Sequence, residues 1–353
     1  MKVVSVVGNR PQFIKAAPVA RALTGLCDHV LVHTGQHYDD ELSQVFFEEL
    51  GLPRAAHRID TGSGTHAHQT AMMLSGVDPV LEDERPALVL VYGDTNSTLA
   101  GTLAASKRHL PLGHIEAGLR SFDRRMPEEV NRVVVDVLSD LRFCPSDTAV
   151  QNLADEGVTA GVHLVGDVMV DAARTFAPIA ARRSDALGRT GVEPGAYALM
   201  TVHRPTNTTP EAAGTLVDVI AAVDMPVVFP MHPRTRAALE RAGQLARAQA
   251  AARTTEPLGY LDFTALLMSA AVCLTDSGGV QKEAYLHEVP CVTLRDTTEW
   301  VETVQAGWNR LCDLEPRAVA AAVAEAARPT LHTPLYGDGD AARRIAAVIT
   351  SGR

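Results

Sequence analysis

The chain has 353 residues, of which 46% are hydrophobic, so it is long enough for two domains that each bury a core of their own. Its formal net charge of -10 argues against nucleic acid as the main partner, because phosphate backbones are bound by basic surfaces. An anionic small molecule stays compatible with this charge, since a local pocket can be basic on an acidic protein.

The cysteines and the apolar runs bear on the compartment. The five cysteines are scattered, odd in number and without a C-x-x-C pair, which is typical of reduced thiols. No apolar run approaches the roughly 18 residues of a membrane span. The chain opens on the strand-like KVVSVVG rather than on a signal peptide. We therefore expect a cytoplasmic protein with no membrane partner.

Short apolar, β-branched runs alternate with amphipathic segments in two successive series. The first series predicts strands at 3–7, 29–33, 87–92, 112–115, 141–144 and 162–165. The second predicts strands at 197–202, 227–229, 271–274, 289–294 and 310–312. Helices are expected between them, including 11–23, 95–108, 146–156, 210–223 and 280–287. Runs that are apolar throughout suit strands covered on both faces.

Strand–helix alternation of this kind predicts parallel, doubly wound sheets. Two series indicate two Rossmann-like domains, at 1–168 and 169–337, because the pattern breaks between 166 and 195. A last helix at 341–349 has no strand after it, so we expect the segment 338–353 to return to the first domain.

Acidic residues follow two strands of the first series. In open α/β sheets ligands bind at the carboxyl ends of the strands, where Asp94 and Glu116 are placed. A helix then opens with Glu128 and Glu129, whose side chains diverge by about 100°, so one of the two is expected to face the ligand. Neighbouring carboxylates can differ widely in pKa, which supplies an acid and a base. Helix capping and dipole effects are the structural alternative for Asp94 and for one of the glutamates.

Basic residues accompany them. Arg10 follows the first strand beside free helix N–H groups, which favour anions, and Lys15 lies one turn further along. His114, inside a strand, is interpreted as a hydrogen-bonded core residue rather than a catalyst.

The second domain has basic and glycine-rich turns at the same strand ends. His203 follows one strand, and Ser277, Gly278 and Gly279 follow another and open a helix that contains Glu283. A helix N-terminus with glycines suits a phosphate group, and Glu283 suits ribose hydroxyls. The spacing is neither a dinucleotide fingerprint nor a Walker loop. The histidines lack the spacing of zinc ligands, so we expect no metal.

Seven segments carry a resemblance through nearly the whole chain: GNRPQFIKAAPV, HTGQHYD, VYGDTNSTLAG, GHIEAGLRSFDRRMPEEVNR, PMHPRT, LTDSGGVQKEA and LRDTTEWVETVQAGWNRL. In combination they resemble the non-hydrolysing UDP-N-acetylglucosamine 2-epimerases. The resemblance implies a glycosyltransferase-B-like fold in which two Rossmann-like domains face each other across an active-site cleft. It also implies a homodimer that acts on a UDP-sugar without a cofactor.

Residue roles follow from the resemblance position by position. Asp94, Glu116 and Glu128 look like the essential carboxylates, which selects Glu128 over Glu129. The remaining roles concern the nucleotide, the uracil (Phe263), basic groups around the sugar and phosphates, and a second, activating UDP-sugar. The nucleotide-site residues are Arg10, His203, Ser277, Gly278, Gly279 and Glu283; the basic groups are Lys15, Arg132 and Arg295; the regulatory positions are Gln36, His37 and Gln69.

The resemblance also includes departures. Thr206 stands where the family usually has a glutamate, and Asn9 and Gln12 stand where threonine and glutamate are common. The HTGQHYD and RSFDRRMPEEVNR segments look closer to branches that act on unusual substrates, which include diacetamido uronic acids.

The implied reaction is epimerisation at C2 of a UDP-N-acetylamino sugar, through loss of UDP to a 2-acetamidoglucal and its re-addition. It would serve amino-sugar or polysaccharide biosynthesis. Four alternatives stay open: a diacetamido uronic acid substrate, a hydrolysing enzyme that releases N-acetylmannosamine and UDP, a glycosyltransferase, and an inactive nucleotide-sugar sensor.

Overall fold

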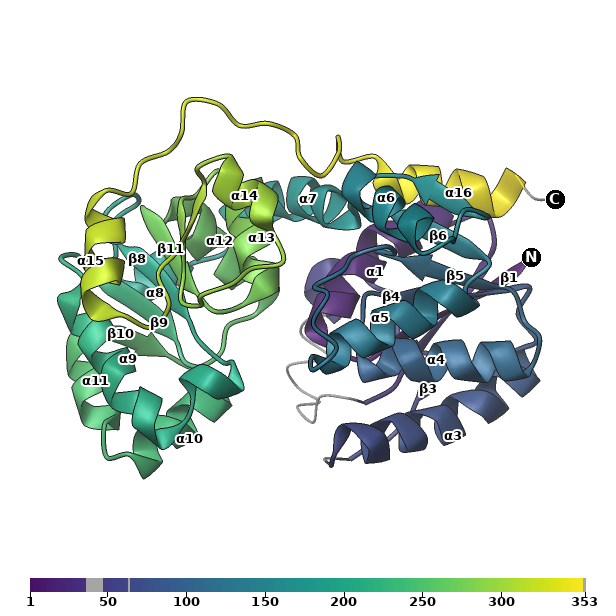
Figure 1. Ribbon diagram of the computed structural model, residues 1–353, viewed down its shortest axis with the longest axis horizontal. Helices are drawn as coiled ribbons and strands as arrows, with labels where there is room; N and C mark the ends of the chain where they lie inside the picture. Colours follow the sequence, from purple (N-terminus) through teal and green to yellow (C-terminus); the bar gives the residue numbers. More distant parts are fainter. Residues whose placement is uncertain (36–46, 63, 352–353) are drawn as a thin grey trace. The chain divides into compact units, whose positions relative to one another are not determined.

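The computed structural model describes residues 1–35, 47–62 and 64–351. The chain forms two compact units, each with a parallel sheet between helices (Figure 1). Unit 1 contains Met1–Thr175 and Pro334–Arg353, and unit 2 contains Phe176–Thr333. In these described ranges, no helix combines the length and apolarity needed to cross a membrane.

The sheet of unit 1 has seven strands in the described residues, in the order β3-β2-β1-β4-β5-β6-β7. All neighbours run parallel, and the order reverses direction beside β1, which is the doubly wound pattern. The strands are β1 (Lys2–Val7), β2 (Asp28–His33), β3 (His57–Arg58), β4 (Leu88–Tyr92), β5 (Leu112–Ile115), β6 (Leu141–Cys144) and β7 (Val162–Leu164).

Helices connect these strands and cover the sheet. They are α1 (Arg10–Leu23), α3 (His66–Glu84), α4 (Asn96–Lys107), α5 (Pro127–Leu138), α6 (Asp147–Asp155), α7 (Val168–Arg183) and α16 (Ala341–Ser351). Local sequence fixes where the two helices nearest the site begin. The Asn9 side chain caps α1, and Thr95 and Thr98 form a reciprocal capping box at α4.

The carboxyl end of β1 is held tightly against α4. A Cβ atom added to Gly8 would lie 1.9 Å from the Ser97 Oγ, so this position has no room for a side chain. Gln12 ties the same region together, because its amide accepts from the Gly8 N–H (2.7 Å) and donates to the Tyr92 carbonyl (2.7 Å). Gln12, where the family commonly has glutamate, thus has a structural role here.

Unit 2 repeats the doubly wound pattern with the parallel strand order β10-β9-β8-β11-β12-β13. The strands are β8 (Ala198–Thr201), β9 (Val227–Pro230), β10 (Arg253–Thr255), β11 (Val272–Thr275), β12 (Cys291–Thr293) and β13 (Asn309–Leu311). The helices are α8 (Ala186–Thr190), α9 (Pro210–Ala222), α10 (Pro233–Arg241), α11 (Leu245–Ala251), α12 (Tyr260–Ser269), α13 (Gly278–Leu286), α14 (Val301–Gln305) and α15 (Pro316–Ala324), with a short 3₁₀ turn η1 (Pro205–Asn207).

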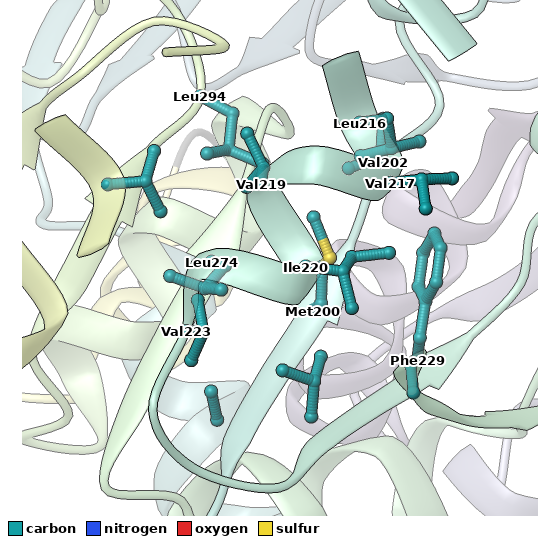
Figure 2. Packing of buried hydrophobic residues seen from close by; sticks show 14 of the residues in the cluster. Met200, Val202, Leu216, Val217, Val219, Ile220, Val223, Phe229, Leu274 and Leu294 are labelled. Carbon is teal, nitrogen blue, oxygen red and sulfur yellow. The ribbon is translucent and has the colours of Figure 1, made fainter. Parts of the chain in front are cut away.

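One hydrophobic cluster of unit 2 lies between α9 and one face of this sheet. Figure 2 shows Leu216 and Ile220 of α9 in this cluster, together with Met200 of β8 and Phe229 of β9. Each of these four side chains is at most 1% exposed. Burial on this scale is the main source of stability and fixes the strand ends that carry functional residues.

The strand and helix pattern predicted from sequence is largely confirmed, with two omissions. The edge strands β3 and β10 were not predicted, because HR and RTT contain no apolar run. The units divide after Thr175 and Thr333, whereas the sequence placed the divisions after 168 and 337. The first division falls inside the continuous helix α7, where no composition break marks it. The last helix, α16, packs against α1 of unit 1.

Candidate active site

Two of the predicted carboxylates lie at one edge of the unit 1 sheet. Asp94 follows β4 after one glycine, and Glu116 directly follows β5. Because β4 and β5 are paired in parallel, their carboxyl ends lie side by side, as the sequence predicted. Asp94 is half-buried, whereas Glu116 is only 9% exposed.

A cation from α1 meets the second of these acids. The Lys15 Nζ forms an ion pair with the Glu116 Oε2. This ion pair lies against the backbone of Gly93, because a Cβ added there would lie 3.2 Å from the Lys15 Nζ and 3.3 Å from the Glu116 Oε2. Glu116 has a φ of 71°, a left-handed conformation that is uncommon outside glycine and costs on the order of 1 kcal/mol. One of the predicted catalytic residues therefore has a strained backbone conformation.

The first acid is paired with α5. Arg132 donates to the Asp94 Oδ2 through Nη2 and to the Glu129 Oε2 through Nη1, the latter at 2.8 Å. Burial disfavours the charge on Arg132, but Asp94 and Glu129 outweigh it, so the pKa of Arg132 is raised. The Asn131 amide also donates to the Asp94 carbonyl at 2.8 Å. Helix α5 therefore holds Asp94 by both its side chain and its backbone.

The structure separates Glu128 from Glu129. Glu129 is 2% exposed, and its carboxylate accepts from the Ser121 N–H (2.8 Å), the Ser121 Oγ (2.9 Å) and the Phe122 N–H (3.0 Å). Burial opposes its ionisation, but these hydrogen bonds and Arg132 lower the pKa of Glu129. Glu128 is half-buried, and within the described residues no hydrogen bond or ion pair engages its carboxylate. This arrangement supports Glu128, rather than Glu129, as the group available for chemistry.

His114 is a core residue, as the sequence interpretation held. Its ring is fully buried, with Nδ1 at 2.6 Å from the Asp136 Oδ1 and Nε2 at 2.7 Å from the Gly93 carbonyl oxygen. Both nitrogens are engaged in the fold, so neither is available to a substrate.

In unit 2 the predicted nucleotide residues follow adjacent strands. His203 lies just after β8, the Ser277–Gly279 turn follows β11, and Arg295 lies just after β12. Strand β11 pairs with both β8 and β12, so these three strand ends are neighbours. Ser277 caps α13, and the buried Glu283 lies in the second turn of this helix. Arg10 belongs to unit 1, so its predicted partnership with His203 stays a prediction.

Asp276 organises this edge and was missed by the sequence analysis. Its carboxylate is fully buried and accepts from the backbone N–H of His203 (3.0 Å) and of Arg204 (2.9 Å). Burial lowers the pKa of His203, as do Arg204 and Arg234, while Asp276 opposes the shift. An acid directly before the Ser-Gly-Gly turn was the available signal, but that turn was interpreted only for its glycines.

Glu299 is a second missed residue. It accepts from Arg295 at 3.0 and 3.2 Å and from Arg204 at 3.3 Å. Burial opposes its ionisation, but the arginines outweigh this effect and lower the pKa of Glu299. Its Oε2 would lie 3.3 Å from a Cβ added to Gly278, so the carboxylate lies beside the helix N-terminus. Arg295 is therefore engaged by an acid and is not held open for an anion in this arrangement.

The remaining predicted positions are less informative. Phe263 of α12 is partly buried against the unit 2 core. Gln69 of α3 accepts from the Asn96 Nδ2 at 3.1 Å, while Gln36 and His37 lie outside the described residues. Gly279 is exposed at the start of α13. Among residues 1–35, 47–62 and 64–351, no group of His, Cys, Asp or Glu is arranged as metal ligands would be.

Comparison with known proteins identifies the family. The family model described as UDP-N-acetylglucosamine 2-epimerase matches residues 22–350. The chain belongs to the UDP-N-acetylglucosamine 2-epimerase family. It is 45% identical to the UDP-2,3-diacetamido-2,3-dideoxy-D-glucuronate 2-epimerase of Pseudomonas aeruginosa, over 98% of both chains. It is 39% identical to the UDP-N-acetylglucosamine 2-epimerase of Methanocaldococcus jannaschii, over the full length of both.

Solved structures of this family share the fold. The crystal structure of the M. jannaschii UDP-GlcNAc 2-epimerase, in complex with UDP-GlcNAc and UDP, has a TM-score of 0.93 at 38% identity and covers all of both chains. The chain has two parallel, doubly wound sheets and is similar in structure to these proteins, which confirms the predicted glycosyltransferase-B-like fold class. The family resemblance seen in the sequence is confirmed as well.

Proposed function

We propose that the protein epimerises C2 of a UDP-linked N-acetylamino sugar, interconverting UDP-N-acetylglucosamine and UDP-N-acetylmannosamine or close derivatives of them. The observation that carries this proposal is the group at the unit 1 sheet edge, where Asp94 and Glu116 each pair with a cation, Arg132 and Lys15. Glu128 adds a carboxylate without such a partner in the described residues. Membership of a 2-epimerase family supports the same reaction class.

The chemistry explains why several acids are needed. The C2 proton of the sugar is not acidic, because no carbonyl group flanks it. When the C1–O bond breaks, its electron pair leaves with UDP and C1 gains cationic character, which acidifies C2–H. A carboxylate then takes the proton, and the C1=C2 bond of a 2-acetamidoglucal forms. Return of a proton to the other face of C2, with re-addition of UDP at C1, gives the epimer.

The charges of the site suit this sequence of steps. Carboxylates stabilise cationic character at C1, and one of them must be ionised to accept the proton. Lys15 pairs with Glu116 and Arg132 pairs with Asp94, so these acids lie in different electrostatic environments. Environments that differ in this way are what separates acid and base roles. We assign Asp94, Glu116 and Glu128 to the proton and charge chemistry, with Lys15 and Arg132 as sugar or phosphate contacts.

Unit 2 supplies the nucleotide contacts in this proposal. His203, the Ser277–Gly279 turn and the N-terminus of α13 suit the diphosphate, since free helix N–H groups favour anions. Glu283 would accept from the ribose hydroxyls, and Phe263 would contact the uracil. Arg10 and Arg295 would add charge to the phosphates, which for Arg295 requires sharing or leaving Glu299. His203 is also a candidate for proton transfer to departing UDP.

A diacetamido uronic acid is the second substrate that an observation favours. The P. aeruginosa relative, 45% identical to this chain, is named for a UDP-2,3-diacetamido-2,3-dideoxy-D-glucuronate. Both substrates undergo the same C2 chemistry, so they differ only in the groups at C3 and C6. Parallel assays with the two UDP-sugars therefore distinguish them, and the better substrate has the higher kcat/KM.

The reaction is tested by incubating the purified protein with UDP-N-acetylglucosamine in D2O, without additives, and following it by NMR. We expect the manno epimer, with deuterium at C2 because the abstracted proton exchanges with solvent. Product with protium at C2 would contradict the proton-exchange mechanism. Stoichiometric release of free N-acetylmannosamine and UDP would instead identify a hydrolysing enzyme. If neither UDP-sugar reacts, the protein is a nucleotide-sugar binding protein rather than an enzyme.

We also propose a cytoplasmic homodimer that serves amino-sugar or polysaccharide biosynthesis. An apolar stripe on α5 supports self-association, since Val130, Val137 and Leu138 are 45%, 58% and 40% exposed. Exposed apolar side chains grouped on one helix are typical of an interface. Light scattering coupled to gel filtration measures the mass, and Val137→Asp should halve it. An unchanged monomer mass in the wild-type protein would contradict the homodimer.

A further inference from the structure

A buried acid on α5 connects both catalytic strand ends, and the proposed mechanism gives it no part. Asp136 lies on the same helix as Glu128 and is fully buried. Its Oδ1 lies 2.6 Å from the His114 Nδ1, and its Oδ2 accepts from Arg120 at 2.7 Å and from the Gly118 N–H at 3.1 Å. A carboxylate this deeply buried is retained only where its partners satisfy it.

The first connection runs to Asp94. The His114 Nε2 lies 2.7 Å from the Gly93 carbonyl oxygen, which can only accept a hydrogen bond. The ring nitrogen must therefore carry a hydrogen. Gly93 has a φ of 62° and directly precedes Asp94, so this bond fixes the turn that aims the Asp94 side chain.

The other ring nitrogen of His114 contacts Asp136. Burial opposes ionisation of Asp136, but His114 and Arg120 outweigh it, and the pKa of Asp136 lies below its ordinary value. The contact between Nδ1 and the Asp136 Oδ1 (2.6 Å) holds one side of the ring, and the bond from Nε2 to the Gly93 carbonyl holds the other. The ring therefore connects Asp136 to the turn that precedes Asp94.

The second connection runs to Glu116. Its left-handed φ of 71° is followed by Gly118 at 81°, so the chain turns sharply directly after β5. The N–H groups of Glu116 and Ala117 both donate to the Phe143 carbonyl at 3.1 Å, and the Gly118 N–H donates to Asp136. Strained conformations persist only where surrounding contacts hold them. Asp136 provides such a contact two residues after the strained glutamate.

Arg120 completes the charge balance and leads to the next segment. Its side chain is 1% exposed and donates to Asp136, and to Glu156 at 2.7 Å. Ser121 and Phe122 follow, and Glu129 holds them. Arg120 thus joins Asp136 to Glu156 and to the segment that Glu129 holds.

From these contacts we propose that Asp136 and His114 are positioning residues, which hold Asp94 and Glu116 in their reactive orientation. The inference rests on the proposed C2 epimerisation. Neither residue touches the substrate in this account, because both are buried within unit 1 and have all their polar atoms engaged. Their effect on the reaction comes from the geometry of two turns.

The direct test is Asp136→Asn, which keeps the shape but removes the charge. We expect kcat, normalised to folded protein, to fall about 10²-fold, the scale of loss that follows from misplacing reacting groups by about 1 Å. KM and the Kd for UDP should stay within about threefold, since most of the proposed nucleotide contacts lie in unit 2 and Arg10 is not among the partners of Asp136. A kcat within threefold of wild type would overturn the proposal.

The matched control is Glu84→Gln. Glu84 has the same kinds of partner, a histidine nitrogen (His57 Nε2, 2.6 Å) and a cation (Lys2 Nζ, 2.6 Å). Lys2 begins β1, so this pair lies at the amino edge of the same sheet. Loss of stability with unchanged kcat is expected. An equal loss of kcat in both variants would show a general effect of weakening unit 1.

A spectroscopic measurement covers the case in which Asp136→Asn fails to fold. In wild-type protein labelled with ¹⁵N-histidine, the His114 ring should show a hydrogen on Nε2 that exchanges slowly with solvent, because it is bonded to the buried Gly93 carbonyl. An Nε2 without a hydrogen would overturn the proposal without any variant. The second variant, His114→Gln, cannot reproduce both contacts of the ring and should lose kcat as Asp136→Asn does. An inactive wild-type enzyme would contradict the proposed function, while the ring signal would still decide whether His114 holds the turn before Asp94.

Discussion

The ammonium group of Lys15 on α1 is paired with the carboxylate of Glu116, although 101 residues separate them along the chain. The pair lies against Gly93, whose missing side chain gives it room. One of the proposed catalytic acids is therefore held by a cation from a helix that also begins with Arg10. The position of this ion pair therefore depends on the absence of a side chain at Gly93 as well as on the two charges.

Gly93→Ala should damage the reaction through this contact. The added methyl group would lie 3.2 Å from the Lys15 Nζ and 3.3 Å from the Glu116 Oε2, so the ion pair must move by a few tenths of an ångström. We expect kcat to fall about tenfold or more, because catalysis is sensitive to small displacements of reacting groups. Steady-state kinetics of epimerisation measures the effect.

Gly25→Ala is the control for backbone strain. Gly25 has a φ of 77°, close to the 62° of Gly93, but an added Cβ meets nothing within 4 Å. Both variants should lose about 1 kcal/mol of stability, the cost of placing a side chain in a left-handed conformation. Only Gly93→Ala should lose activity. Equal activities in the two variants would show that the contact with the ion pair is unimportant.

The two adjacent glutamates of α5 should respond in opposite ways. Glu128→Gln should lower kcat by about 10²-fold, the usual scale for an acid–base group, and leave the melting temperature unchanged. Glu129→Gln should lower the free energy of unfolding by about 2 kcal/mol, because its buried carboxylate holds Ser121, Phe122 and Arg132. Urea titration and kinetics on both variants test this. A stable, inactive Glu129→Gln enzyme would reverse the assignment.

Asp276→Asn should weaken nucleotide binding. Asparagine has one acceptor oxygen with two lone pairs, whereas Asp276 accepts from three groups, the N–H groups of His203 and Arg204 and the Asn207 amide, so one of these hydrogen bonds is lost. The turn that carries His203 should shift, and the Kd for UDP should rise about tenfold, which corresponds to about 1.4 kcal/mol. Calorimetric titration of UDP measures it.

Thr209→Ala serves as the control for unit 2. Thr209 caps α9, and its loss should cost about 1 kcal/mol of stability. The Kd for UDP should not change in this variant. If UDP binds equally well to wild type, Asp276→Asn and His203→Ala, the nucleotide site lies elsewhere.

Acidification from pH 7 to pH 5 should destabilise both units. Burial lowers the pKa of His29 in unit 1 and of His287 in unit 2 from 6.5 to about 4. Below pH 6.5 the unfolded chain takes up the proton while the folded chain does not, so the free energy of unfolding falls. The loss is at most about 2 kcal/mol per ring at pH 5, and less where solvent reaches the ring.

The pH effect can be assigned by substitution. His29→Gln and His287→Gln should each make the free energy of unfolding depend less on pH, whatever their effect on stability at pH 7. Urea unfolding at several pH values gives the comparison. An unchanged pH dependence in both variants would mean that neither ring is kept neutral by the fold.

The sequence predicted the elements that depend on local residue patterns better than those that depend on contacts between residues far apart in the chain. Strands β5 (LGHI) and β6 (LRFC) were predicted with the observed bounds, because apolar residues begin and end each segment and helical patterns flank it, which is a local signal. The edge strand β3 consists of His57 and Arg58 and exists only because β2 offers a partner. Such a strand carries no signal of its own.

The candidate site shows the same division. Most acids and bases that follow strands were found, since topology places them at one edge. Asp276 directly follows β11 but was not found, and neither were Asp136 and Glu299, because their importance lies in partners 73, 22 and 95 residues away. A buried acid in a helix pattern looks like any other polar position until its partners are known.

Unit 2 interrupts unit 1, because Phe176–Thr333 is one continuous stretch while unit 1 also needs Pro334–Arg353. During synthesis, the N-terminal sheet would therefore emerge long before the helix that completes it. Unit 2 has all its residues first, and domains tend to fold as units. Helix α16 must then find α1 and be capped by Asp171, which accepts from the N–H groups of Ala341 and Ala342. The sheet of unit 1 is therefore synthesised early, but it is completed only when α16, the last helix of the chain, has been made.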